Sequence, residues 1–247
     1  MKELKTKELK FIAAVALTAA VLGGCRGAAP ASCKCCRAWE HPDSSAWEDV
    51  FDKTLSNAEM PAGSWKYNDD GWLVPVTGDT IFSKRDYGNC VVDLVYVMAP
   101  SANSGLFLYD TEHPKKKFEV QILDDFHAMY RDERVNQLTG SIYGRKAATP
   151  CNSNPPGEEN RMTVWCEGGR IRVAVNGLLV CDADLDDFRD GEINPDGTRV
   201  PPWHKGFPAL ATIPRHGRIG LQGVHNSDAA VKFKYLKVKE LKKEAGK

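Results

Sequence analysis

Apolar and polar side chains alternate along several short stretches of the chain, and this period of two is that of a half-buried β-strand. The clearest stretch has the sequence Phe-Glu-Val-Gln-Ile-Leu. Phe118, Val120 and Ile122 would face a core. Glu119 and Gln121 would point the other way, onto either a solvated sheet face or the floor of a polar site. Helical periodicity is weak throughout the chain.

Asp124 follows this stretch and raises a question of burial. In a regular strand it would fall on the face of Phe118, where burying a carboxylate costs several kcal/mol. A one-residue bulge between Gln121 and Asp124 would return the carboxylate to the face of Glu119, and bulges are common beside active sites. We therefore expect a bulge here, with Glu119 and Asp124 converging on one concave face.

Further stretches are predicted to be strands, by alternation or by apolar runs between turn residues. They are residues 72–76, 80–83, 89–98, 105–109, 139–143, 161–166, 170–175, 178–181, 217–222 and 231–241. Many short strands with frequent turn residues favour an all-β fold, a jelly-roll β-sandwich of two antiparallel sheets. We expect one such domain over residues 47–247.

The strands within residues 161–182 are predicted to form a continuous three-strand meander. Asn176-Gly177 is a strong signal for a two-residue hairpin turn. Cys166 and Cys181 would lie on the outer strands, roughly 9–10 Å apart across the middle strand. This separation exceeds the reach of a disulfide, so we expect that these two cysteines are not bonded to each other.

The N-terminus carries a separate pattern. Lysines precede an apolar run from Phe11 to Leu22, which is too short to span a bilayer comfortably. The sequence Leu22-Gly-Gly-Cys25 is typical of a bacterial lipobox, so residues 1–24 are predicted to be a lipoprotein signal peptide and Cys25 the lipidated residue. The alternative is an ordinary secretory signal. Lipid anchoring would place the protein in the bacterial cell envelope, at the outer membrane or the periplasmic face.

Residues 25–46 are rich in Ala, Pro, Ser and Cys and are predicted to be a flexible tether. Cys33, Cys35 and Cys36 favour disulfides in an oxidising compartment over a soft-metal site, because three thiols without a nearby His make a weak site.

Composition adds one exclusion. Of the 247 residues, 42% are apolar and 27% are charged, which is ordinary for a globular protein. Basic and acidic residues balance at 33 each. Because no basic field is present, we expect no nucleic-acid partner.

Several motifs occur in the order found in a known family. They are Asn103-Ser-Gly105, the run from Phe118 to Asp124, Thr139-Gly-Ser-Ile-Tyr143, Asn176-Gly177 and Gly217-Arg-Ile-Gly-Leu-Gln222. From Trp47 to Leu241 the chain resembles the 3-keto-disaccharide hydrolase domain family. The resemblance implies a jelly roll similar to concanavalin A and the laminarinases, in secreted or lipid-anchored bacterial proteins that act on sugars. It also implies activity on 3-keto-glycosides, which members of the family cleave.

Glu119, Gln121 and Asp124 have the spacing of the Glu-x-Asp-x-x-Glu run in laminarinase-type jelly rolls, where two carboxylates flank the glycosidic bond. Glycosidases place two carboxyls about 5–5.5 Å apart for retention and about 6.5–9.5 Å apart for inversion. Glu119 and Asp124 are therefore the candidate catalytic residues. A ketone at C3 of the sugar opens another route, because it acidifies the C2 hydrogen and a single base can start an elimination.

Polar and aromatic residues elsewhere are candidates for substrate binding. They are Gln121, Asn103, Tyr143, Gln222, His225 and Trp203. Tyr143 and Trp203 would offer platforms for sugar rings, and His225 would exchange protons near pH 7. The structural alternatives are a solvated sheet face for Gln121, a turn for Asn103, a plain core or surface position for Tyr143 and Trp203, and an ordinary loop for His225.

No cofactor or metal site is expected. Asp182, Asp184, Asp186 and Asp187 raise the alternative of a Ca²⁺ site, because Ca²⁺ takes oxygen ligands. A solvated acidic loop is the favoured interpretation of this cluster.

Two function classes remain. The first is a lipid-anchored, glycoside hydrolase-like protein that cleaves glycosidic bonds, including those of 3-keto-glycosides. The second is a non-catalytic, lectin-like carbohydrate-binding module on the cell envelope. A close pair of Glu119 and Asp124 would favour catalysis, whereas splayed carboxylates beside an aromatic platform would favour binding. In both classes the partners are a carbohydrate and, through the anchor, a membrane.

Overall fold

The computed structural model describes residues 38–111, 117–130, 132–204, 206, 208–225 and 229–242. The expected signal peptide, the lipidation site Cys25 and the cysteines at positions 33, 35 and 36 lie outside these ranges. Within the ranges, no helix has the length and apolar character needed to cross a membrane.

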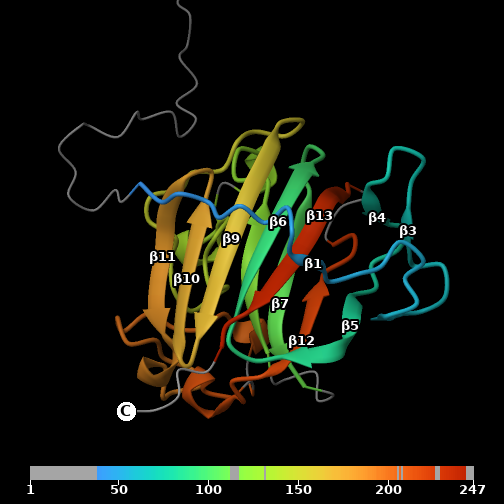
Figure 1. Cartoon of the computed structure of the whole chain (residues 1–247). Coiled ribbons are helices and arrows are strands. Elements are labelled where there is room, and N and C mark those ends of the chain that lie inside the picture. Colours follow the sequence, from blue (N-terminus) through green and yellow to red (C-terminus); the bar gives the residue numbers. More distant parts are fainter. Residues whose placement is uncertain are drawn as a thin grey trace, which may run out of the picture.

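The described chain is all-β and forms two antiparallel sheets packed face to face (Figure 1). The strands are β1 (Glu48–Asp49), β2 (Ala58–Glu59), β3 (Trp65–Tyr67), β4 (Leu73–Pro75), β5 (Ile81–Tyr87), β6 (Cys90–Met98), β7 (Asn103–Asp110), β8 (Phe118–Leu123), β9 (Glu159–Glu167), β10 (Arg170–Val175), β11 (Leu178–Asp184), β12 (Gly217–Leu221) and β13 (Val231–Glu240). Short 3₁₀ turns are η1 (Ala128–Tyr130), η2 (Val135–Gln137), η3 (Leu185–Asp187), η4 (Pro202–His204) and η5 (Leu210–Thr212).

The larger sheet has the order β11-β10-β9-β6-β13-β4-β3, with β1 paired beside β13. The smaller sheet has the order β2-β5-β12-β7-β8. Every strand pair in both sheets is antiparallel, which confirms the predicted jelly-roll sandwich.

Every predicted strand except one is present. The meander β9-β10-β11 turns at Asn176 and Gly177, whose φ angles of +47° and +82° match a two-residue hairpin turn. Cys166 and Cys181 lie on its outer strands, and both are free thiols, so they are not bonded to each other, as predicted.

Residues 139–143 do not form the predicted strand. Gly140 and Gly144 adopt φ angles of +83° and +68°, which belong to turns and interrupt a ladder. The segment forms one isolated β-bridge with β8, between Val120 and Ile142, and three backbone hydrogen bonds with Glu119 and Gln121. It therefore runs along the edge of β8 as irregular backbone.

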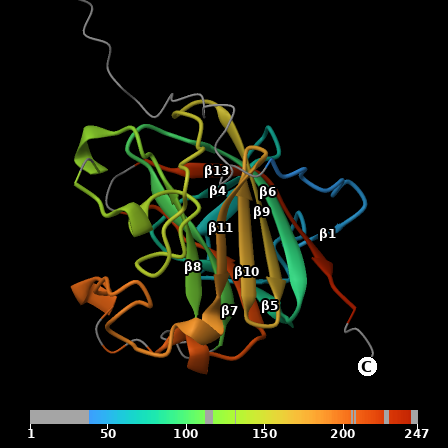
Figure 2. The ribbon, with the colours of Figure 1, turned by 90° about the vertical axis from the view of Figure 1, so that its left-hand side faces the viewer.

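Alternation along β8 places its apolar side chains between the sheets. Phe118, Val120 and Ile122 are 3%, 0% and 0% exposed. Glu119 and Gln121 accordingly lie on the outer face of the smaller sheet. Figure 2 shows the yellow-green segment after β8 and the orange segment after β11 lying beside β8, where they cover this face.

Residues 38–46, which we call the N-terminal strap, lie across the outer face of the larger sheet (Figure 1). The Trp39 N–H donates to the Gly177 carbonyl at 2.8 Å, and the Gly177 N–H donates to His41 Nε2 at 2.9 Å. The rings of Trp39 and Trp165 pack edge to face with centroids 5.0 Å apart. The predicted flexible tether is therefore wrong for residues 38–46, because these contacts make them part of the folded domain.

Asp93 joins the N-terminal strap to the sheet. Its carboxylate is fully buried, at 0% exposure, in the middle of β6. It accepts hydrogen bonds from Ser44 (2.6 Å), Thr163 (2.6 Å), Tyr235 (3.1 Å) and twice from Arg161 (3.1 and 2.9 Å). A charge in a strand that is otherwise apolar on both faces is thus fully hydrogen-bonded.

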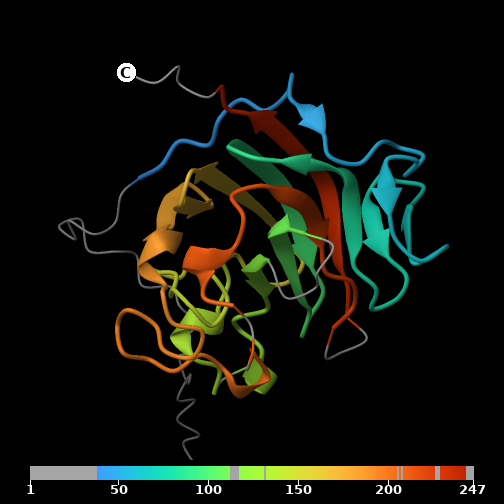
Figure 3. The ribbon, with the colours of Figure 1, turned by 90° about the horizontal axis from the view of Figure 1, so that it is seen from below.

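The N-terminal strap lies on one side of the sandwich, and the segments that follow β8 and β11 lie on the other. Seen from below, the blue strap runs along one side and the orange and yellow-green segments gather on the other (Figure 3).

Candidate functional site

A pocket of about 230 Å³ opens on the outer face of the smaller sheet. It is lined by Asn103, Glu119, Gln121, Tyr143, Trp203, His204, Gln222 and His225. All the residues predicted to bind substrate are therefore brought together with Glu119. Asp124 is absent from the lining, and His204 is an addition.

Glu119 lies across the backbone of the neighbouring strand. A Cβ atom added at Gly105 would come within 2.1 Å of Glu119 Oε1, so the carboxyl group rests on the space that a side chain at position 105 would fill. The Gln121 amide reaches Glu119 Oε1 at 3.3 Å and Ser104 O at 3.1 Å when its nitrogen faces these two acceptors. The missing side chain at Gly105 and the amide of Gln121 together set the position of the carboxyl.

The acidity of Glu119 is altered by its surroundings. Burial raises the pKa of Glu119 to about 7, and the nearby Lys117 ammonium acts in the opposite direction. A carboxyl group with such a pKa exchanges protons in the neutral range, which is the property required of a general base at neutral pH.

Asp124 does not join Glu119. The pairing of β7 with β8 is continuous from Leu108 opposite Phe118 to Asn103 opposite Leu123, so the predicted bulge is absent. The Asp124 carboxylate is buried and accepts the backbone N–H groups of Ser101 (2.8 Å) and Phe126 (3.1 Å).

The bulge prediction failed because these backbone donors satisfy the Asp124 carboxylate in the turn after β8, on the side where a regular strand leaves it. The described lining of the pocket therefore contains one carboxyl group, that of Glu119.

Tyr143 is held beside Glu119 by the backbone. Its N–H donates to the Glu119 carbonyl at 2.9 Å, and its hydroxyl accepts from Gln137 Nε2 at 3.0 Å. Burial raises the pKa of Tyr143, so the phenol remains protonated at neutral pH and can donate a proton or a hydrogen bond.

His204 was not predicted as a site residue. Its ring packs edge-on against Tyr143 with centroids 5.3 Å apart. Burial, helped by the positive charge of Arg145, lowers the pKa of His204 to about 4, so the imidazole is neutral at pH 7. The signal in the sequence was its place next to Trp203 in a long insertion, where strand periodicity gives no guide to side-chain direction.

Amide groups supply further hydrogen-bonding capacity. Asn103 Oδ1 lies 3.2 Å from the amide of Gln121. Gln222 is placed by its backbone N–H, which donates to the Gly105 carbonyl at 3.0 Å. Its side-chain Oε1 is buried and has no hydrogen-bond partner among the described residues, so it can accept from a ligand hydroxyl.

Trp203 and His225 stand at the rim of the pocket. Trp203, on η4, is 63% exposed, and His225 is exposed beyond the end of β12. An exposed indole at the mouth of a polar pocket fits the predicted sugar-stacking platform, which stays a prediction.

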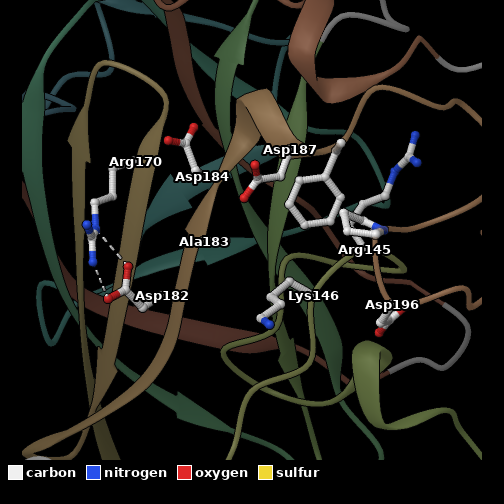
Figure 4. A pocket seen from close by; sticks show the side chains of 10 residues that line it. Arg145, Lys146, Arg170, Asp182, Ala183, Asp184, Asp187 and Asp196 are labelled. Atoms are coloured by element: carbon white, nitrogen blue, oxygen red, sulfur yellow. Dashed lines mark hydrogen bonds and ion pairs between the residues drawn. The ribbon is translucent and has the colours of Figure 1, made fainter.

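A larger cavity of about 600 Å³ lies beside β10 and β11, next to the acidic residues Asp182, Asp184 and Asp187 (Figure 4). Its walls are Arg145, Lys146, Arg170, Asp182, Ala183, Asp184, Asp187, Phe188, Pro195 and Asp196. Arg170 pairs with Asp182 at 2.8 Å. Asp184 accepts the backbone N–H of Asp186 at 3.0 Å, and the Asp186 carboxylate pairs with Arg215.

These separate pairings explain why the acidic cluster does not converge. Among the described residues no group of three or more His, Cys, Asp or Glu side chains is arranged to hold a metal ion. The Ca²⁺ alternative for Asp182, Asp184, Asp186 and Asp187 is not supported by this arrangement.

Comparison with known proteins adds to the geometry. A family model for a 3-keto-alpha-glucoside-1,2-lyase-like domain matches residues 46–239. Among solved structures, a proposed glycosyl hydrolase from Parabacteroides distasonis is similar to this chain, with 33% sequence identity and a TM-score of 0.74. The aligned part covers 79% of this chain and 99% of that protein.

Two more proposed glycosyl hydrolases from the same organism show the same fold. They are 21% and 23% identical, with TM-scores of 0.60 and 0.57. The aligned parts cover 76% and 80% of this chain, and 90% and 84% of those chains. No curated protein matches the sequence.

Proposed function

Since this chain belongs to the family of 3-keto-alpha-glucoside-1,2-lyase-like domains, we propose that it cleaves glycosides whose sugar ring carries a ketone at C3. The observation that carries the proposal is that Glu119, with a pKa of about 7, supplies the single carboxyl group among the described residues that line the pocket. Ordinary glycosidases need two carboxylates flanking the bond. A 3-keto-glycoside needs only one base, because its C2 hydrogen is acidic.

The proposed reaction begins when Glu119 takes the proton from C2. The electron pair of the C2–H bond is delocalised into the C3 ketone as an enolate. This pair then forms the C1–C2 double bond as the C1–O bond breaks, and the departing alkoxide takes a proton. Addition of water across the double bond in a later step makes the overall outcome a hydrolysis.

The remaining residues have roles that fit this chemistry. The amides of Gln121, Asn103 and Gln222 would hold the sugar hydroxyls and the enolate oxygen. The protonated phenol of Tyr143 would donate a proton to the departing oxygen. Trp203 would stack on the sugar at the mouth of the pocket.

A lectin-like module is the second candidate. The exposed Trp203 beside a pocket rich in amide groups favours it, because sugar binding requires a platform and hydrogen bonds but no base. The separation of Asp124 from Glu119 also fits binding without chemistry. Turnover decides between the two candidates.

We expect the described domain to cleave 3-keto-glucosides and to leave the matching unoxidised glucosides intact. Because the base must be deprotonated, kcat/KM should rise with pH through about 7 and fall about tenfold per pH unit below it. Mass spectrometry of the released product, carried out between pH 5 and 9, measures both the choice of substrate and the pH dependence of kcat/KM. Saturable binding of either sugar without any release of product would support the lectin-like module instead.

We also propose that the protein is anchored in the cell envelope through Cys25, on the basis of the sequence Leu22-Gly-Gly-Cys25. Cys25→Ala should move the protein from the membrane fraction to the soluble fraction of the expressing bacterium. Mass spectrometry of the wild-type N-terminus should find acyl chains on Cys25. An unlipidated wild-type protein that fractionates like the variant would contradict the proposal.

A further inference from the structure

A small hollow of about 40 Å³ adjoins the pocket and shares Glu119, Tyr143 and His204 with it. Lys117, the residue before β8, also lines this hollow. Side chains two positions apart along an extended chain lie on the same face, so Lys117 and Glu119 stand side by side. The ammonium and the carboxyl therefore share one confined space.

Two aromatic rings hold the Lys117 ammonium. Nζ lies 3.5 Å from the centroid of the Phe107 ring and 5.1 Å from that of Phe82. The two rings are stacked, with centroids 6.1 Å apart. Phe107 is the residue directly opposite Glu119 in the pairing of β7 with β8. Cation–π contact thus fixes the ammonium over the cross-strand neighbour of Glu119.

Among the described residues, the other charged side chains near the hollow make hydrogen bonds or ion pairs of their own. Arg218 Nη2 lies 2.6 Å from Asp110 Oδ2, and Arg218 Nη1 lies 2.7 Å from Glu59 Oε2. Arg145 donates from its guanidinium to two main-chain carbonyls, at 3.0 and 3.2 Å. Arg218 is thus shared between two carboxylates, and the Asp110 carboxylate also acts on the Lys117 ammonium. Of the cations near the hollow, Lys117 is the one whose charge acts on Glu119.

Arg145, His204 and Tyr143 also line the hollow, and the last two carry no charge at pH 7. Burial lowers the pKa of His204 to about 4 and raises the pKa of Tyr143. A neutral imidazole and a neutral phenol do little to hold a carboxylate in its ionised form.

We propose that Lys117 is a positioning residue for Glu119: its ammonium, held on the Phe107 ring, keeps the buried carboxyl ionised and ready to accept a proton. This inference rests on the proposed role of Glu119 as the base. The directions of the shifts agree with it. Burial raises the pKa of Glu119 and the charge of Lys117 lowers it, while burial lowers the pKa of Lys117 and the carboxylates of Asp110 and Glu119 raise it.

The test is a ¹³C NMR titration of protein labelled at the glutamate carboxyl carbons. The Glu119 resonance is identified by its loss in Glu119→Gln. In Lys117→Met the titration midpoint should move upward by roughly one pH unit, the size of effect that an adjacent opposite charge produces. Lys117→Arg should restore the wild-type midpoint, because it keeps the cation on the ring. Lys117→Gln serves as a second neutral variant if Lys117→Met does not fold.

Lys84→Met is the matched control. Lys84 is an exposed lysine on β5 of the same sheet, and its ammonium donates to the Ser56 carbonyl at 2.8 Å, away from the hollow. Its removal should leave the Glu119 midpoint in place. An unchanged midpoint in both neutral variants of Lys117 would overturn the inference.

The titration needs no substrate, so its result is separate from the fate of the proposed function. If the protein turns over a 3-keto-glycoside, the acid limb of kcat/KM should move upward in Lys117→Met together with the NMR midpoint. A protein without turnover on any 3-keto-glycoside would refute the proposed function, and the midpoint would still decide the role of Lys117.

Discussion

Replacing Glu119 by glutamine is expected to lower kcat on a 3-keto-glycoside by roughly 10²–10⁴-fold, the usual contribution of an acid–base group. Glutamine keeps the shape that fits over Gly105 and retains a hydrogen-bonding group for Gln121. It removes the oxygen that accepts the proton. The fold and KM should therefore change little, which steady-state kinetics and a thermal melt can establish.

Asp124→Asn provides the comparison, because it neutralises the other carboxylate that the sequence predicted to be catalytic. Asp124 caps a turn and does not line the pocket, so kcat should be close to that of the wild type. An equal loss of kcat in the two folded variants would restore the two-carboxylate mechanism. A loss confined to KM in Glu119→Gln would reduce Glu119 to a binding residue.

Asp93→Ala is expected to lower the free energy of unfolding by about 3 kcal/mol, the lower end of the cost of breaking a buried ion pair. Arg161 would lose its partner, and three hydroxyl groups would lose their common acceptor. The value lies at the lower end because the Arg161 side chain is 32% exposed and can be partly hydrated. Urea unfolding followed by tryptophan fluorescence measures the change.

Asp49→Ala is the control for this measurement. Asp49 lies on the same sheet and pairs with Lys237 at 3.5 Å, but its side chain is 53% exposed. Exposed pairs contribute about 0–1 kcal/mol, so this variant should be nearly as stable as the wild type. Equal losses in the two variants would mean that the buried hydrogen bonds of Asp93 contribute little.

Alternation along β8 was enough to predict where Glu119 and Gln121 point. The reason is physical: a strand buried on one face must turn every second side chain to the other face. Another local signal, the Asn-Gly pair, predicted the turn at Asn176 in the meander. Strand order and sheet pairing were left to the resemblance with known jelly rolls.

Asp124 and Asp93 show where the local rule ends. The cost of burying the Asp124 carboxylate predicted a bulge, but the backbone N–H groups of Ser101 and Phe126, in turns on either side, offset that cost. Asp93 is satisfied by residues far away in the sequence, and one of them, Ser44, lies in a segment expected to be a tether. Both outcomes depend on tertiary donors that no period along one strand reveals.

His204 and residues 139–143 were missed for another reason. Residues 139–143 follow turns set by glycines with positive φ, Gly140 and Gly144, and His204 lies on η4 in the long insertion. A Cβ at Gly144 would approach Pro201 Cδ to 2.6 Å, so this glycine also permits η4 to pack against the site. Such close approach depends on two distant segments meeting, which hydrophobic periodicity does not report.

The N-terminal strap reaches the domain on the outer face of the larger sheet, whereas the pocket opens on the outer face of the smaller one. A lipid, an affinity tag or a biosensor chip attached ahead of residue 38 is therefore linked to the described domain on the side of the sandwich away from the pocket. Protein tethered through its N-terminus should therefore keep the pocket open to solution.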